Sequence, residues 1–234
     1  MQVTRRTLLG PAALSAVSVP RRSWAQARTI RVGVLNDQSG PYQNTSGMLS
    51  VAAVRQAVQD AGDVGFPVEV LIGDHQNKPD LGAALARQWI DREGVDMIID
   101  VPTSSVALAV DTIMRGGNKV YISTGSAAVD LTGALCTPNT IHWSYDTSML
   151  AKSSGGAVVR AGGTSWYFLS ANYVFGQQLQ RDTTAIVTAS GGTVLGASVY
   201  PFPGTTDFSS FLLSAQALGA KVLGLAVGFR RPLQ

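Results

Sequence analysis

Short apolar runs alternate with segments of helical periodicity along residues 29–226, and this alternation is the strongest constraint on the fold. A strand, a helix and a second strand build a parallel sheet, because the helix carries the chain back through a right-handed crossover. Strands buried in such sheets read as continuous apolar runs. The sequence therefore predicts an α/β fold of doubly wound parallel sheets. The expected strands are residues 29–35, 67–72, 97–101, 119–123, 165–170, 193–200 and 221–226.

An extended aromatic segment interrupts this alternation at residues 140–145 (TIHWSY). We interpret it as a crossover between two lobes, because linkers between compact units fall where the regular pattern breaks. The expected first lobe is residues 28–143. Residues 144–234 then form a partial second lobe, whose sequence diverges from residue 227 onward.

Residues 1–27 have the features of an export signal. Arg5 and Arg6 precede an apolar segment at residues 8–19, which is shorter than the ~20 residues needed to span a bilayer. Residues 25–27 (AQA) fit a small-x-small cleavage site. We therefore expect a twin-arginine-like signal peptide and a periplasmic mature chain. An uncleaved signal anchor is the alternative, and the short apolar run argues against it.

The charge balance changes when this segment is set aside. Four of the 18 basic residues and none of the 15 acidic residues lie in residues 1–27, so the net charge falls from +3 to −1. A chain without a basic excess gives no argument for nucleic acid binding. The one cysteine, Cys136, has no internal disulfide partner. No later apolar run is long enough to cross a membrane.

Motifs of the common enzymes built on parallel sheets are missing. The turn at residues 35–40 (LNDQSG) has neither dinucleotide-binding nor P-loop spacing, and the G-x-S-x-G of hydrolases is not found. The two histidines, His75 and His142, fall in different expected elements, which disfavours a zinc site. We expect His75 to be a solvated loop residue and His142 to be structural. No catalytic residue, metal ligand or cofactor is expected.

Polar residues gather where the strand at residues 97–101 ends. Pro102 ends that strand because it lacks a backbone amide for a central sheet ladder. Thr103, Ser104 and Ser105 then provide hydroxyls and free amides at the start of a helix. Such amides at the carboxyl edge of a parallel sheet suit a carboxylate. Helix capping alone is the alternative explanation for the serines.

Three further polar loops are expected at the same edge, at residues 39–45, 125–127 and 172–176. The first two belong to one lobe and the third to the other, so all would face one crevice. Hydroxyls, backbone amides and a few aromatic rings suit a small polar ligand with an apolar part. The aromatic residues in these loops are Tyr42, Tyr173 and Phe175.

Taken together, the strand-end motifs resemble those of the type I periplasmic solute-binding proteins of the branched-chain amino acid (Leu/Ile/Val-binding) ABC transporter family. The resemblance covers about residues 29–226. It is carried by SGPY at 39–42, PTSS at 102–105, YIS at 121–123, YVFG at 173–176 and GTTDFS at 204–209.

The resemblance also implies a ligand site. In that family the serine after the third strand and the small residues after the fourth hold the carboxylate and amino group of the ligand. The family often has Thr where Ala127 stands and Tyr where Phe175 stands. The expected ligand-binding residues are Ser104, Ser105, Gly125, Ser126, Ala127, Tyr42, Tyr173 and Phe175.

The function implied by the resemblance is that of an extracytoplasmic, non-enzymatic solute-binding protein. It would close two lobes over a small amino-acid-like ligand, deliver it to ABC permease and ATPase subunits, and meet the membrane only through the permease. A receptor for amides, urea or aromatic acids on the same fold is an alternative, as are a periplasmic sensor domain and a periplasmic hydrolase. Because the family continues beyond a strand such as KVLGLA, we expect a C-terminally truncated chain with an incomplete second lobe.

Overall fold

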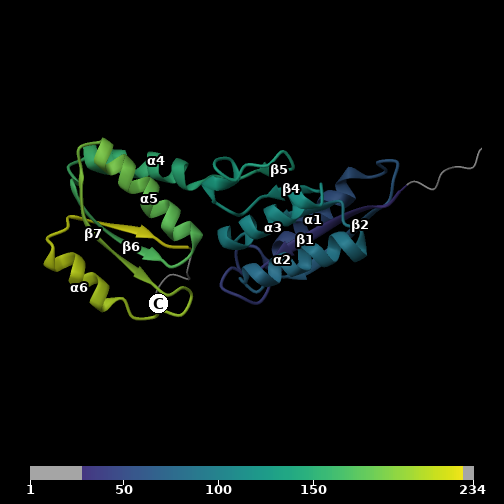
Figure 1. Cartoon of the computed structure of the whole chain (residues 1–234), viewed down its shortest axis with the longest axis horizontal. Coiled ribbons are helices and arrows are strands. Elements are labelled where there is room, and N and C mark those ends of the chain that lie inside the picture. Colours follow the sequence, from purple (N-terminus) through teal and green to yellow (C-terminus); the bar gives the residue numbers. More distant parts are fainter. Residues whose placement is uncertain (1–27, 229–234) are drawn as a thin grey trace, which may run out of the picture.

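Two separate parallel sheets organise the chain in this computed structural model, which describes residues 28–228 (Figure 1). The predicted signal segment, residues 1–27, lies outside the described residues. The strands of the first sheet are β1 (Ile30–Asn36), β2 (Val68–Asp74), β3 (Met97–Asp100), β4 (Val120–Ser123) and β5 (Thr140–His142). The strands of the second sheet are β6 (Ser165–Ala171), β7 (Thr193–Tyr200) and β8 (Val222–Ala226).

Helices connect successive strands in both sheets. Those of the first lobe are α1 (Gly47–Ala61), α2 (Pro79–Gln88) with a short π-helical continuation η1 (Trp89–Glu93), α3 (Ser104–Gly116) and a short 3-10 helix η2 (Val129–Leu131). Those of the second lobe are α4 (Thr147–Arg160), α5 (Val174–Ala189) and α6 (Ser209–Ala217).

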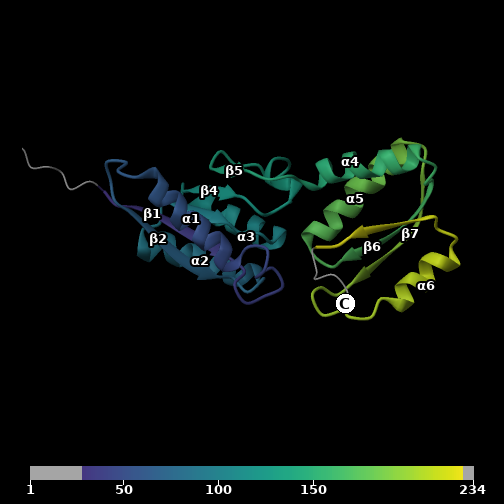
Figure 2. The ribbon, with the colours of Figure 1, turned by 180° about the vertical axis from the view of Figure 1, so that it is seen from behind.

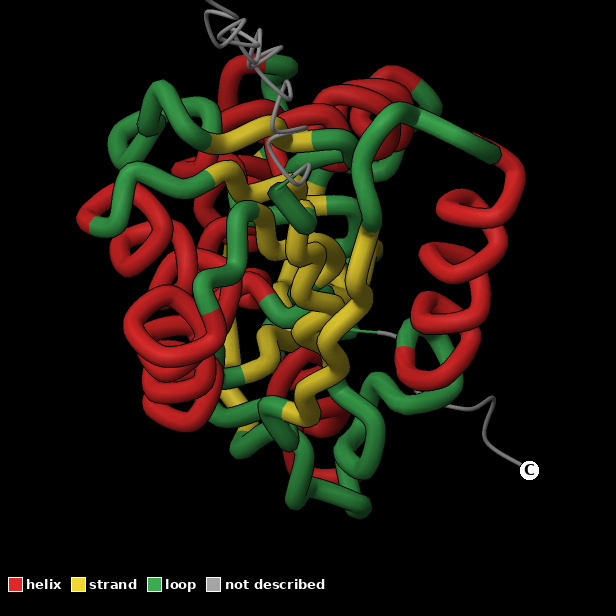
Figure 3. The backbone as a smooth tube through the Cα atoms, turned by 90° about the vertical axis from the view of Figure 1, so that its right-hand side faces the viewer, coloured by secondary structure: helices red, strands yellow, loops and turns green. Residues whose placement is uncertain are grey.

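Strand order confirms the predicted doubly wound α/β fold. The sheets run β2-β1-β3-β4-β5 and β7-β6-β8, and every pairing is parallel. In each sheet the first strand in the sequence lies between the second and the third, so the chain reverses its direction of winding there. A crevice forms at the carboxyl ends of the strands beside such a reversal. Figure 3 looks along the molecule and shows the strands enclosed by helices on both sides.

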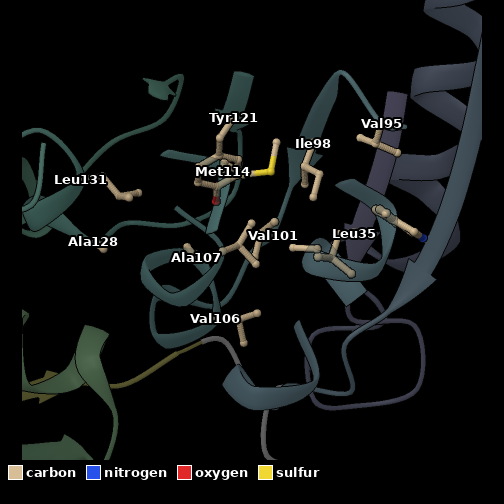
Figure 4. Packing of buried hydrophobic residues seen from close by; sticks show 13 residues of the cluster. Leu35, Val95, Ile98, Val101, Val106, Ala107, Met114, Tyr121, Ala128 and Leu131 are labelled. Atoms are coloured by element: carbon tan, nitrogen blue, oxygen red, sulfur yellow. The ribbon is translucent and has the colours of Figure 1, made fainter. Parts of the chain in front are cut away.

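The first core forms where α2 and α3 cover one face of the sheet. Ile98 of β3 points into this core together with Leu35, Val106, Val110 and other fully buried side chains (Figure 4). The neighbours of Ile98 along the strand, Met97 and Ile99, point to the opposite face, toward α1. This alternation follows from the two-residue period of a strand, and it places helices on both faces.

Residues 140–145 differ from the prediction that the whole segment is a crossover. Residues 140–142 form β5, which pairs with β4 from Tyr121↔Thr140 to Ser123↔His142 and so completes the first sheet. The pairing satisfies backbone groups along the outer edge of β4, which a free crossover would leave open to solvent. Only residues 143–146 then link the first sheet to α4, the first helix of the second lobe, and the side chain of Trp143 in that link is 75% exposed.

The second sheet is centred on β6, whose residues Trp166 to Ala171 are all buried. Trp166 and Phe168 pack toward α4 and α5, whereas Leu169 and Ala171 pack toward Phe208 and other aromatic residues near α6. Figure 2 shows α4 and α5 on one side of these strands and α6 on the other. No helix within residues 28–228 is long and apolar enough to cross a membrane.

Candidate ligand-binding cavity between the lobes

A cavity of about 380 Å³ lies where the carboxyl ends of the two sheets meet. Its wall takes residues from both lobes, including the turn between β3 and α3 and the start of α5. The lining residues are Tyr42, Pro102, Ser104, Gly125, Ala127, Tyr145, Leu150, Tyr173, Phe175, Leu179, Val227 and Gly228. Aromatic and aliphatic side chains predominate, and the polar groups are hydroxyls and backbone atoms.

The turn from β3 into α3 is bent sharply before it reaches the cavity. Asp100 and Val101 adopt left-handed backbone conformations, with φ of 86° and 55°. A β-branched residue rarely occupies this region, and the surrounding structure holds it there: Val101 is fully buried and its N–H donates to Leu35 O at 3.0 Å. The bend directs Pro102 and Ser104 into the cavity wall.

Ser104 and Ser105 lie within the first turn of α3, because Thr103 is the N-cap residue. The side chain of Thr103 makes no capping hydrogen bond. Ser104 lines the cavity. Ser105 instead accepts a hydrogen bond on Oγ from the backbone N–H of Val174 at 3.3 Å, across the boundary between the lobes.

Ser126 stands directly behind Ser104. Its Oγ donates to Ser104 Oγ at 3.4 Å and accepts from Ala128 N at 3.2 Å, and it is fully buried. His142 Nε2 lies 2.7 Å from the carbonyl oxygen of Ser126 and so holds this loop against β5. Ser126 therefore positions the hydroxyl of Ser104, and His142 has the structural role expected of it.

Gly125 and Ala127 contribute the backbone of the same loop to the cavity wall. A Cβ atom on Gly125 would lie 3.0 Å from the Cα atom of Pro102, so only glycine lets the two turns approach this closely. The loop also contacts the second lobe, since the N–H of Thr147 donates to Ala127 O at 3.1 Å.

Two tyrosines meet across the cavity. The hydroxyls of Tyr42 and Tyr173 lie 2.5 Å apart, and both rings contact Phe202, with ring centroids at 6.0 and 5.0 Å. Burial raises the pKa of Tyr42 to about 12 and raises the pKa of Tyr173 as well. Both phenols are therefore neutral at ordinary pH, and one donates its proton to the other.

The loop that carries Tyr42 is organised by a buried carboxylate. Asp37 accepts hydrogen bonds from the N–H groups of Gly40 at 2.7 Å and Tyr42 at 2.8 Å. Burial raises the pKa of Asp37, and these two donors act in the opposite direction. The SGPY motif is thus wrapped around Asp37, which fixes the position of the Tyr42 ring.

A second polar bridge joins the lobes beside the cavity. Gln178 of α5 accepts a hydrogen bond from Val129 N at 3.1 Å and donates one from Nε2 to Asp130 Oδ2 at 2.7 Å. Its side chain is only 5% exposed. One carboxamide therefore ties the second lobe to η2 of the first through both of its polar ends.

The structure brings most of the predicted site residues into one wall. Ser105 and Ser126 are the two that lie outside it, the first between the lobes and the second behind Ser104. The predicted residues that line the cavity are Ser104, Gly125, Ala127, Tyr42, Tyr173 and Phe175. The wall also contains residues that the sequence did not single out for ligand contact: Pro102, Tyr145, Leu150, Leu179, Val227 and Gly228.

Metal binding finds no support within residues 28–228, where no group of three or more histidine, cysteine or acidic side chains is placed to hold an ion. The expectation that His75 is solvated is wrong, because its side chain is fully buried. Burial lowers the pKa of His75 to about 4. Its Nδ1 accepts a hydrogen bond from Asn77 N at 3.0 Å, so this neutral histidine stabilises the loop after β2.

Comparison with known proteins gives a consistent result. The family model described as periplasmic binding protein matches residues 29–231. A periplasmic binding protein from Burkholderia mallei has a TM-score of 0.82 and 43% identity, with 86% of this chain and 54% of that chain covered. A branched chain amino acid ABC transporter periplasmic ligand-binding protein from Burkholderia xenovorans LB400 has a TM-score of 0.69 and 35% identity, with 83% and 52% covered.

A curated relative shows the same partial overlap. The Leu/Ile/Val-binding protein homolog 4 of Brucella abortus is 24% identical over 217 residues, which are 88% of this chain and 52% of the relative. The chain therefore spans about half the length of the curated relatives it matches.

Proposed function

Because the chain belongs to the periplasmic binding protein family, we propose that it is an extracytoplasmic solute-binding protein that holds a small carboxylate between two lobes. In this proposal the lobes are residues 28–143 and 144–234, so that the boundary between them falls within the link at residues 143–146. The observation that carries the proposal is the position of Ser104: it lies in the first turn of α3 and lines an aromatic cavity built by both lobes.

The cavity suggests how a carboxylate would be oriented. The start of α3 presents unpaired amides and the positive end of a helix dipole, an interaction of roughly 0.3–1 kcal/mol. The Ser104 hydroxyl adds a donor, and the backbone at Gly125 and Ala127 lies beside it. The apolar part of the ligand would then contact Tyr42 and Phe175 on the other walls.

Two ligand classes fit this orientation. The names of the relatives support an amino-acid-like ligand, since they describe Leu/Ile/Val-binding and branched-chain amino acid transport. A second class, apolar or aromatic acids without an amino group, is favoured by the lining itself. None of the lining residues within the described chain is acidic, so none of their side chains supplies a charged partner for an ammonium group.

Matched ligand pairs separate the two classes. Leucine and 4-methylpentanoate differ only in the amino group, as do phenylalanine and 3-phenylpropionate. Calorimetric titration of the chain with all four compounds measures what the amino group contributes. Tighter binding of the amino acids supports the first class, and tighter binding of the deaminated acids supports the second.

Ser104→Ala tests the carboxylate position. A hydrogen bond to a charged group is worth about 1.5–3 kcal/mol, so the variant should weaken binding of the preferred ligand roughly tenfold or more. Ser210→Ala on the exposed surface of α6 is the control and should bind like the unaltered chain. Equal affinity of Ser104→Ala and the control would contradict the proposal.

The proposal includes the route of export and the transport partners. Arg5 and Arg6, outside the described residues, would direct the precursor to twin-arginine export, and ABC permease and ATPase subunits would receive the ligand. Arg5→Lys together with Arg6→Lys keeps the charge but should leave the precursor in the cytoplasm. Cell fractionation with N-terminal sequencing measures this, and a mature start at Arg28 in the double variant would exclude the route.

A further inference from the structure

Asp100 is a buried carboxylate that the proposed ligand contacts do not use. It ends β3, just before the turn that carries Pro102 and Ser104, and it is 4% exposed. Its side chain does not line the cavity between the lobes. It lies directly behind the wall instead, because a Cβ atom on Gly125 would be 3.3 Å from Asp100 Oδ1.

Neutral donors from three elements hold this carboxylate in place. Asn36 Nδ2 of β1 donates to Asp100 Oδ2 at 3.2 Å, and Thr124 Oγ1, which follows β4, donates to Asp100 Oδ1 at 3.2 Å. The side chain of Ser50 in α1 makes a further hydrogen bond to it. Burial raises the pKa of Asp100, and these three donors act in the opposite direction. Donors at both oxygens favour the ionised form of the carboxylate.

No cation balances the charge of Asp100 within residues 28–228. None of the ion pairs among these residues involves it, and no charged group contributes to the shift of its pKa. The titratable group that feels its charge is Tyr121 of β4, a neutral phenol whose pKa is raised by burial. An uncompensated charge in a buried position acts over several ångströms with far less screening than in bulk water. The charge of Asp100 therefore reaches into the cavity on the other side of Gly125.

We propose that this charge makes Asp100 a determinant of ligand specificity, which selects amino acids over simple carboxylic acids of the same carbon skeleton. The inference rests on the proposed function, because it requires a ligand carboxylate in the cavity. A simple acid brings a net negative charge close to Asp100 and is repelled. An amino acid has no net charge, since its ammonium group offsets its carboxylate, so the repulsion largely cancels. Asp100 thus contributes to selectivity through space, without touching the ligand.

Asp100→Asn removes the charge and keeps the shape of the side chain. The new amide can accept from Asn36 Nδ2 with its oxygen and donate to Thr124 Oγ1 with its nitrogen, so both hydrogen bonds are retained. The backbone is compatible as well, because residue 100 has a φ of 86° and asparagine is among the residues that adopt left-handed conformations. The variant should therefore fold and keep the wall of the cavity intact.

Matched ligand pairs measure the selectivity of the two proteins. Leucine, 4-methylpentanoate, phenylalanine and 3-phenylpropionate are titrated by calorimetry at pH 8 into the unaltered chain and into Asp100→Asn. The ratio of the dissociation constant of each acid to that of its amino acid should fall roughly tenfold in the variant, because the acids gain affinity and the amino acids change much less. An unchanged ratio would overturn the inference and leave the proposed function standing. Failure of all four compounds to bind either protein would contradict the proposed function, and this inference with it.

Asp111→Asn is the matched control for the loss of a buried charge. Asp111 is a carboxylate of the same lobe, is 3% exposed and accepts hydrogen bonds from Thr137 and Thr140. It lies about two turns along α3 from the cavity wall at Ser104, so its neutralisation should leave the ratio unchanged. A fall as large as that in Asp100→Asn would show that the net charge of the lobe sets the preference, and would overturn the inference.

Asp100→Gly separates the charge from the shape of the side chain. Glycine also suits the left-handed backbone at this position, but it removes the hydrogen bonds to Asn36 and Thr124. A similar fall of the ratio in Asp100→Gly and Asp100→Asn supports an effect of charge. A fall in Asp100→Gly alone would assign the selectivity to the packing of the wall and overturn the inference.

Discussion

Burial of His75 makes the stability of the first lobe depend on pH. The imidazole is fully buried, and its pKa falls from 6.5 to about 4. Above pH 6.5 both the folded and the unfolded chain hold it neutral. As the pH falls toward 4 the unfolded chain takes up a proton that the folded chain excludes, so stability is lost over this window. The loss from this group reaches roughly 3 kcal/mol.

His75→Gln removes this titration. Urea unfolding of the variant should therefore lose less stability between pH 7 and pH 4 than urea unfolding of the unaltered chain. The comparison uses the change with pH, because the substitution also alters packing at every pH. Parallel curves of unfolding free energy against pH for the two proteins would show that His75 does not titrate differently on folding.

At the level of single residues, the sequence predicted which strand ends meet at the cavity better than it predicted what surrounds each side chain. The strand-end motifs placed Ser104, Gly125 and Tyr42 at the cavity, because hydroxyls, small residues and aromatic rings at the carboxyl ends of strands can be recognised in the sequence. Burial of His75 could not be predicted from the sequence, since it depends on the close approach of α2. A Cβ on Gly82 of that helix would lie 3.6 Å from His75 Cβ. The role of Ser126 behind Ser104 depends in the same way on contacts between two loops.

Packing of one tryptophan ring fixes the spacing between elements in the first lobe. The ring of Trp89 in η1 lies over β1 and β2 at Gly33 and Gly73. A Cβ on Gly33 would lie 2.5 Å from Trp89 Cζ3, closer than any stable contact. Gly33→Ala should therefore force the ring outward and destabilise the fold by about 1–3 kcal/mol, measured by urea unfolding.

Gly116→Ala is the matched control at the end of α3. Nothing lies within 4 Å of the added Cβ there, and alanine favours helix over glycine by up to about 1 kcal/mol. The two substitutions should therefore shift the free energy of unfolding in opposite directions. A destabilisation of equal size at both positions would show that the Trp89 contact is not responsible.

Elements were predicted well where the hydrophobic period was long and clear, as in α5 and β6. Residues 140–142 were misassigned because three residues are too few to show a period, and their strand character comes from the open edge of β4. The faces of α4 and α5 that turn Leu150 and Leu179 toward the cavity were not predicted either. Which face of a helix meets another lobe depends on how the lobes sit together.

At the scale of the whole molecule, the lobes meet through a small number of polar bridges and through the contact of the Tyr42 ring with Phe202, near one covalent link. The sequence predicted two lobes and a crevice, but it could not identify Gln178 as a bridge. A glutamine in an amphipathic helix is ordinarily predicted to be exposed to solvent. Only the arrangement of α5 against η2 buries it and pairs both ends of its carboxamide.

Gln178→Glu should separate the lobes. The carboxylate can still accept from Val129 N, but its second oxygen would face Asp130 Oδ2, to which the amide now donates at 2.7 Å. Two carboxylates at this distance repel each other, and the lost charge-assisted hydrogen bond alone is worth about 1.5–3 kcal/mol. The population of separated lobes should rise roughly tenfold or more, seen as a larger radius of gyration in small-angle X-ray scattering.

Two further variants identify the cause of the separation. Gln180→Glu adds the same charge to the same helix, but a carboxylate at this position can still accept the hydrogen bond that Ser170 Oγ donates at 2.6 Å. Its radius of gyration should equal that of the unaltered chain. Combining Gln178→Glu with Asp130→Asn restores a donor opposite an acceptor, with the two roles exchanged, and should bring the lobes together again. An unchanged radius in Gln178→Glu, or an increase that Asp130→Asn does not reverse, would show that contact between the lobes does not depend on this pair.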